Sequence, residues 1–185
     1  MTAEPIFTIG HSNRTLEAFL ALLHGEQVAA VVDVRSAPSS RKWPHFDGPA
    51  LAAALNADGM DYRHAPDLGG HRPASHLPPE VNGYWQHAGF HNYADYAMGE
   101  PFAAALQRLL TESSDRRSAV MCAEAVWWRC HRRIIADYLL ARGRRVRHIL
   151  SATQTVDATP TPAARPQADG RVAYPPSADD QGASR

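Results

Sequence analysis

The sequence predicts a single α/β domain with a mostly parallel sheet flanked by helices. Three observations lead to this prediction. The chain has 185 residues, a usual length for one domain. Short apolar runs alternate with segments whose apolar residues recur at helical spacing, which is typical of α/β proteins. The run from Val28 to Val34 is almost continuously apolar, as expected of a parallel strand covered on both faces.

In the first half of the chain, the pattern predicts three strands and two helices. The apolar run Pro5–Ile9 predicts a strand, and Thr15–Leu23 carries apolar residues on one face of a helix. Val28–Val34 predicts the second strand. Pro49–Ala57 predicts a helix, and Met60–His64 a third, weaker strand. Strands separated by helices imply right-handed crossovers and therefore a parallel sheet.

The second half begins with a long segment rich in proline and glycine, Pro66–Gly89, which predicts a loop that packs through its aromatic residues. After it, Phe102–Leu110 predicts a helix and Ser118–Cys122 a fourth strand. Cys130–Ala141 predicts the next helix, and Arg145–Leu150 a last strand. Residues 1–150 are therefore expected to form the domain. Residues 151–185 are poor in large aliphatics and predict a disordered tail.

The overall composition limits the classes of function. Positive and negative side chains balance at 19 each, so strong non-specific attraction to nucleic acid or to an anionic membrane is not expected. No apolar run is long enough for a membrane span, and the first residues lack the pattern of a signal peptide. We therefore expect a cytoplasmic protein. In that reducing compartment, Cys122 and Cys130 are expected to be free thiols, with a redox pair as the alternative.

Polar side chains gather where the predicted strands end. Ligand sites of parallel sheets lie at the carboxyl ends of the strands, so these segments are expected to converge. They supply the following candidate site residues: His11, Ser12, Arg14, Asp33, Arg35, Arg41, Gly69, Gly70, Cys122, Glu124, Cys130, His131 and Arg132.

Several of these residues also have plain structural interpretations. Ser12 or Asn13 could cap the following helix, and Asp33 could hold Arg35 as scaffolding. Together with Arg14, Arg41 and Arg132, Arg35 could bind one anionic ligand, whereas each arginine alone is more typical of a solvated face.

The thiol at the end of the fourth predicted strand is the strongest chemical candidate. A position before a helix would lower the pKa of Cys122 and make it a nucleophile, although most free cysteines are simply buried. Zinc is a rival interpretation. However, Cys130 and His131 would point about 100° apart as neighbours on one helix, so we assign no metal ligand. On the same helix, Arg133 and Asp137 are expected to form a surface pair.

Five ordered motifs resemble the bacterial family known as domain of unknown function 488: TIGHSNR, VVDVRSAPSSR, DYRHAPDLGG, NYADYAM and MCAEAVWWRCHRRIIADYLLARG. The resemblance spans about residues 6–150. It implies a Rossmann-like α/β domain and no established activity. The motif positions that carry over are Gly10, His11, Ser12, Arg14, Asp33, Arg35, Pro38, Ser40, Arg41, Leu68, Gly69, Gly70, Tyr93, Cys122, Glu124, Cys130, His131 and Arg132.

The sequence leaves three functions open. The first is an enzyme acting on a small anionic or nucleotide-like substrate, with Cys122, Glu124 and His131 as catalytic residues and the other candidates binding the substrate. The second is a non-catalytic nucleotide or nucleic-acid binding module that uses Arg14, Arg35, Arg41 and the basic segment 144–147, with Trp127 or Trp128 for stacking. The third is a metal-binding protein that uses Cys122, Cys130 and a histidine such as His11. The sequence identifies no cofactor and no oligomeric state.

Overall fold

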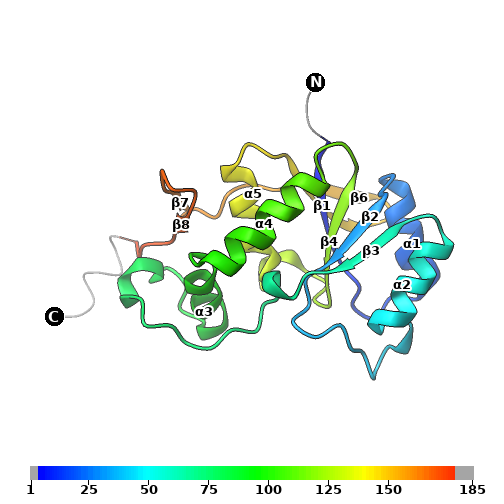
Figure 1. Ribbon diagram of the computed structural model, residues 1–185, viewed down its shortest axis with the longest axis horizontal. Coiled ribbons are helices and arrows are strands. Elements are labelled where there is room, and N and C mark those ends of the chain that lie inside the picture. Colours follow the sequence, from blue (N-terminus) through cyan, green and yellow to red (C-terminus); the bar gives the residue numbers. More distant parts are fainter. Residues whose placement is uncertain (1–3, 178–185) are drawn as a thin grey trace.

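The computed structural model describes residues 4–177, and within them the chain forms the expected Rossmann-like α/β fold around a six-stranded sheet (Figure 1). The strand order is β3-β2-β4-β1-β5-β6, and every neighbouring pair is parallel except β5 and β6. The strands are β1 (Ile6–Gly10), β2 (Ala30–Asp33), β3 (Asp61–His64), β4 (Ser118–Cys122), β5 (Val146–Ser151) and β6 (Gln154–Asp157).

Helices cover both faces of the sheet. In Figure 1, α1 and α2 lie on one side of the strands, and α3, α4 and α5 lie on the other. The helices are α1 (Leu16–Gly25), α2 (Gly48–Ala57), α3 (Ala88–Ala97), α4 (Glu100–Glu112) and α5 (Arg132–Ala141). Within residues 4–177, no helix is long and apolar enough to cross a membrane.

The alternation of side chains along the strands divides the core into two layers. In β4, Ala119 and Met121 pack with the layer of α1 and α2, whereas Val120 and Cys122 pack with the layer of α3 to α5. This follows from the two-residue period of a strand. The thiol of Cys122 is therefore on the same side of the sheet as α5.

The start of α1 differs from the capping expectation. The hydroxyl of Thr15, not the side chain of Ser12 or Asn13, accepts a hydrogen bond from the amide of Ala18 at 3.1 Å. Ser12 instead has a positive φ of 49°, in the left-handed region, two residues after the end of β1. The turn that follows β1 is thus separate from the cap of the helix.

The long segment after β3 packs closely, as its aromatic residues predicted. Trp85 is buried and stacks on Phe90, with ring centroids 4.9 Å apart. The helix α3, which the sequence patterns did not predict, anchors the segment because Tyr93 donates its hydroxyl to the carbonyl of Leu68 at 2.8 Å. The same helix supplies buried Asp95, which accepts a hydrogen bond from the segment.

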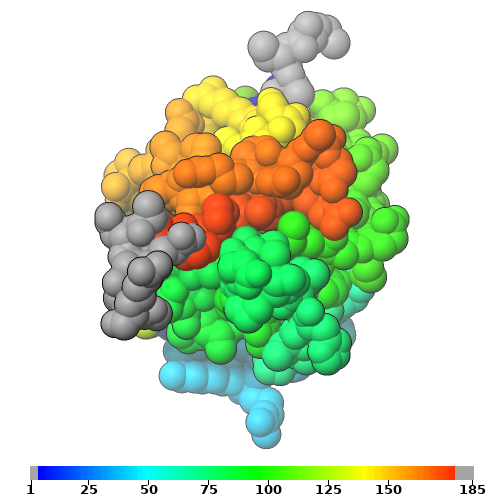
Figure 2. Space-filling model, turned by 90° about the vertical axis from the view of Figure 1, so that its left-hand side faces the viewer, coloured from blue at the N-terminus to red at the C-terminus, as the bar shows by residue number. Residues whose placement is uncertain are grey.

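The expectation of a disordered tail from residue 151 is wrong up to Ser177. This part of the chain contains β6 and a small antiparallel pair, β7 (Arg165–Pro166) and β8 (Val172–Ala173). Figure 2 shows it in orange and red, lying against the green surface of the α3 region. Tyr174 is fully buried and donates its hydroxyl to Asp137 at 3.0 Å. Residues 178–185, which belong to the same expectation, lie outside the described residues.

The anchoring of this segment also corrects the expected surface pair on α5. Asp137 is buried and accepts hydrogen bonds from the Thr161 amide and from Tyr174. Arg133 donates to the hydroxyl of Thr161 at 3.1 Å instead of pairing on the surface. A carboxylate is buried only where donors satisfy it, and here the C-terminal segment supplies those donors.

Candidate functional site

A cleft of about 940 Å³ opens at the carboxyl edge of the sheet. It is formed where β1, β2 and β4 end, as the crossover rule predicts for parallel sheets. Eight of the expected site residues line it: His11, Ser12, Arg35, Gly70, Cys122, Glu124, Cys130 and His131. Five do not: Arg14, Asp33, Arg41, Gly69 and Arg132.

Two sulfur atoms and one imidazole meet in this cleft. The Sγ atom of Cys122 lies 4.0 Å from Nδ1 of His131, and the Sγ atom of Cys130 lies 3.5 Å from the same nitrogen. All three atoms lie within 4.8 Å of one another. On the other side of the ring, Nε2 of His131 lies 3.0 Å from the carbonyl of Val34, to which it donates. In the neutral imidazole, the lone pair is then on Nδ1 and faces the sulfurs.

The backbone before α5 makes this convergence possible. Cys130 is extended, with φ −129° and ψ 148°, and α5 begins only at Arg132. Cys130 and His131 are therefore not successive positions of one helix. The expectation that their side chains diverge by about 100° is wrong for this reason.

The buried guanidinium of Arg132 holds the cluster in place. Its Nε donates to the sulfur of Cys130 at 3.3 Å, and it also donates to the carbonyl of Glu124. Arg132 thus joins the start of α5 to the loop after β4. Its side chain stabilises the site from within the core, and Arg132 does not line the cleft.

The two thiols differ in acidity. A hydrogen bond from Cys122, with contributions from His131 and Arg132, holds the pKa of the Cys130 thiol well below its usual range. The same hydrogen bond, together with burial, raises the pKa of Cys122. The sequence predicted a lowered pKa for Cys122, and this is wrong because that thiol is the donor of the pair.

The two glycines after β3 are required by close packing. A Cβ atom on Gly70 would lie 2.4 Å from Nδ1 of His131, so the backbone here covers the imidazole. A Cβ atom on Gly69 would lie 2.7 Å from the hydroxyl oxygen of Ser36 and 2.8 Å from the carbonyl oxygen of Pro66. These glycines bring the segment after β3 against the cluster.

Asp33 and Arg35 form a buried pair that builds one wall of the cleft. The guanidinium donates to the carboxylate through Nε at 2.9 Å and through a terminal nitrogen at 2.6 Å, and it also donates to the carbonyl of Phe46. The hydroxyl of Tyr62 donates to the same carboxylate at 2.8 Å. Asp33 therefore holds Arg35 in place as scaffolding, which is one of the two roles that the sequence left open.

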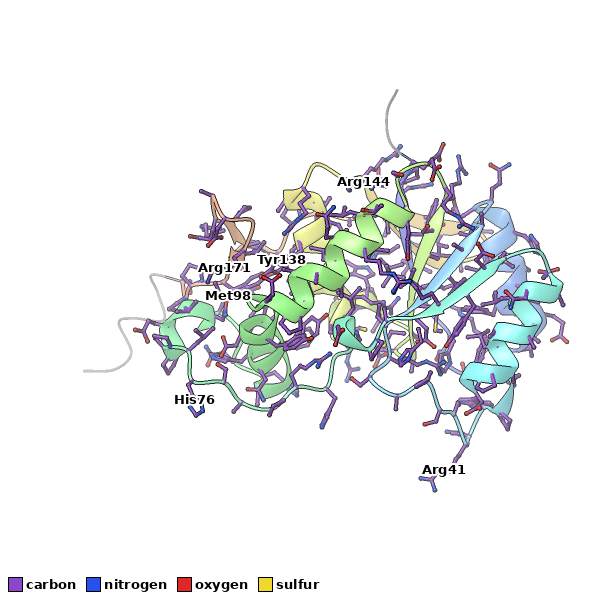
Figure 3. The ribbon with its side chains drawn as sticks, viewed as in Figure 1. Arg41, His76, Met98, Tyr138, Arg144 and Arg171 are labelled. Carbon is purple, nitrogen blue, oxygen red and sulfur yellow. The ribbon has the colours of Figure 1, made fainter. Side chains whose placement is uncertain are left out.

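The four arginines that the sequence grouped together do not share one face. Arg35 is held by Asp33, and Arg14 donates to the carbonyls of Gly10 and Leu150. Arg41 projects into solvent at the tip of its loop (Figure 3). The expected common anion site is therefore not formed. Asp33 binds the guanidinium of Arg35, and backbone carbonyls accept hydrogen bonds from Arg14 and from the buried Arg132.

Two other cations line the cleft, and sequence reasoning missed both as ligand contacts. Lys42, the single lysine of the sequence, lies over the ring of Trp43, and Arg129 lies just before Cys130. Among residues 4–177, neither side chain forms an ion pair. The spacing from Cys122 to Arg129, seven residues, was a signal that could have identified Arg129.

Behind the cluster, His148 is buried against Trp127. The rings stack at 4.3 Å with an interplanar angle of 6°, and Nδ1 of His148 lies 2.7 Å from the hydroxyl of Thr8. Burial, and to a smaller extent the positive charge of Arg132, lowers the pKa of His148 to about 4. Trp127 is half-buried, and one face of its ring packs on the buried His148.

This histidine makes the fold sensitive to acid. Above pH 6.5 it is neutral in both states; below that pH the unfolded chain gains a proton that the folded chain gains only near pH 4. As the pH falls from 6.5 to about 4, we therefore expect His148 to lower the free energy of unfolding by up to about 3 kcal/mol. Urea unfolding of His148→Gln at pH 7 and pH 4.5 should show a smaller acid-dependent loss than the unchanged chain. The exposed control His76→Gln should lose as much as the unchanged chain, and an equal loss in both variants would contradict the assignment.

Comparison with protein-family models matches residues 15–139 to one described as domain of unknown function DUF488. Searches of curated proteins and of solved structures gave no significant match.

Proposed function

This chain belongs to the DUF488 family of unknown function, and we propose that it is an enzyme acting on a small anionic or nucleotide-like substrate bound in the cleft. The observation that carries the proposal is the convergence of Cys122, Cys130 and His131, from the end of β4 and the start of α5. Proteins use sulfur and imidazole for nucleophilic and proton-transfer steps, and they also use them as ligands of catalytic metal ions.

The size and charge of the cleft support a small anion as the substrate. A volume of about 940 Å³ lies within the range of small-molecule sites. Lys42 and Arg129 present positive charge on its walls, and among residues 4–177 Glu124 is the one carboxylate that lines it. We propose that the two cations hold the anion and that Glu124 orients the substrate or accepts a proton.

The alternative of a nucleic-acid binding module has less support. Arg144 donates to backbone carbonyls of Glu4, Leu110 and Ser113, so this guanidinium is already used. It precedes β5, at the edge of the sheet opposite the cleft, and Figure 3 shows it far from Arg41. The basic segments therefore do not form one surface with the cleft.

We expect Lys42→Ala and Arg129→Ala each to weaken binding of an anionic ligand about tenfold or more, since a hydrogen bond to a charged group contributes about 1.5–3 kcal/mol. Inorganic phosphate, adenosine monophosphate and succinate serve as probes in thermal-shift and calorimetric titrations. Arg165→Ala, which removes an exposed arginine outside the cleft, is the matched control and should bind as the unchanged chain does. Failure of all three probes to bind, or binding by both cleft variants as tight as that of the unchanged chain, would reject the anionic substrate.

A further inference from the structure

The Cys122, Cys130 and His131 cluster has the donor spacing of a tetrahedral metal site. With zinc–sulfur bonds of about 2.3 Å and zinc–nitrogen bonds of about 2.0–2.1 Å, tetrahedral angles place sulfur and nitrogen roughly 3.6 Å apart. The observed distances from Nδ1 of His131 are 3.5 Å to Cys130 and 4.0 Å to Cys122. Only small side-chain shifts would be needed to close the site around an ion.

We propose that these three residues are the protein ligands of one divalent metal ion of the zinc class. Thiolate and imidazole donors select zinc and similar transition metals, whereas magnesium and calcium prefer oxygen. Binding replaces the thiol protons with the ion and releases them to solvent. The charge of two thiolates then balances the charge of the ion.

The contacts around the donors support this assignment. A ligating histidine almost always donates its other ring nitrogen to a carbonyl or carboxylate, which orients the ring. His131 does so, through Nε2 to the carbonyl of Val34 at 3.0 Å, and its Nδ1 points at both sulfurs. Arg132 donates to the sulfur of Cys130, and this hydrogen bond fixes a second donor. Two of the three donors are thus oriented by the surrounding protein.

The cluster supplies three ligands, and its fourth position opens on the cleft. Three protein ligands with one open position are typical of catalytic zinc, whereas structural sites have four. Cys122, Cys130 and His131 all line the cleft, so a water molecule or a substrate atom could complete the coordination. Glu124 lines the same cleft, and its Oε1 accepts a long hydrogen bond, 3.4 Å, from the amide of Val126.

The test is a titration of the reduced, chelator-treated chain with Co²⁺ and then with Zn²⁺. We expect one Co²⁺ per chain, with a sulfur-to-cobalt charge-transfer band and the intense visible bands of tetrahedral cobalt, and displacement of the cobalt by Zn²⁺. Cys122→Ser, Cys130→Ser and His131→Ala should each weaken binding by at least about 100-fold, more than the loss of an outer contact does. His76→Ala, at a surface histidine outside the cleft (Figure 3), should bind as the unchanged chain does.

Absence of cobalt binding, a spectrum without the sulfur band, or an unchanged spectrum in a folded His131→Ala variant would overturn the proposal. Circular dichroism establishes whether each variant is folded. If the serine variants do not fold, the spectrum of the unchanged chain decides, because only thiolate ligands give that charge-transfer band. The metal site does not require an anionic substrate, so metal and anion binding can fail separately.

Discussion

Replacing Asp33 with alanine is expected to cost about 3–5 kcal/mol of unfolding free energy, because it leaves the guanidinium of Arg35 buried without its counterion. The carboxylate is fully buried, and Arg35 is 6% exposed. The hydrogen bonds that the Asp33 carboxylate accepts from Arg35 and Tyr62 would all be lost. Urea unfolding at pH 7 measures the effect. For a small domain with a total stability of about 5–15 kcal/mol, this loss is large.

The double variant Asp33→Leu with Arg35→Leu tests how much of the loss in Asp33→Ala comes from leaving one buried charge without its partner. When both charges are removed, apolar side chains can fill the space, and such replacements are often neutral or stabilising. We therefore expect the double variant to be more stable than Asp33→Ala. A loss below about 1 kcal/mol in Asp33→Ala would show that Arg35 reaches water when unpaired, and that the wall of the cleft is more open than its burial indicates.

The strands and the edge that carries the site were predictable because both depend on local pattern. The apolar runs in β1, β2 and β4 identify buried parallel strands, and parallel strands place their carboxyl ends together. The same rule predicts that Cys122 lies at the same edge as His11 and Arg35, and all three line the cleft.

What the sequence did not predict depends on contacts between distant segments. The burial of Val172 and Tyr174 requires α5 and the loop before α3, and local composition does not reveal such partners. An error of two residues at the start of α5 was enough to separate Cys130 from His131 in the expected geometry. Lys42 and Arg129 lie in a loop and a short turn, where no periodicity marks a side chain as facing a cleft.

Gly10→Ala should be the most disruptive single methyl addition near the site. A Cβ atom at Gly10 would lie 1.9 Å from the carbonyl oxygen of Glu124, which is backbone and cannot rotate away. The segment after β4 cannot easily move away from the segment after β1, because the amides of His11 and Ser12 donate to the carbonyls of Cys122 and Ala123 at 2.9 and 3.0 Å. We expect a loss of about 3 kcal/mol or more in urea unfolding, at or above the usual cost of overpacking.

Gly25→Ala is the matched control, since a Cβ atom at Gly25, the last residue of α1, meets nothing within 4 Å. Alanine is favoured over glycine in a helix, so this variant should be neutral or more stable by up to about 1 kcal/mol. The Glu124 carbonyl that Gly10→Ala would displace also accepts the hydrogen bond from Arg132, which in turn holds the sulfur of Cys130. A shift at Gly10 should therefore disturb the thiol cluster as well as the sheet. If Gly10→Ala unfolds at the same urea concentration as Gly25→Ala, the loop after β4 is not held against β1 as the contacts require.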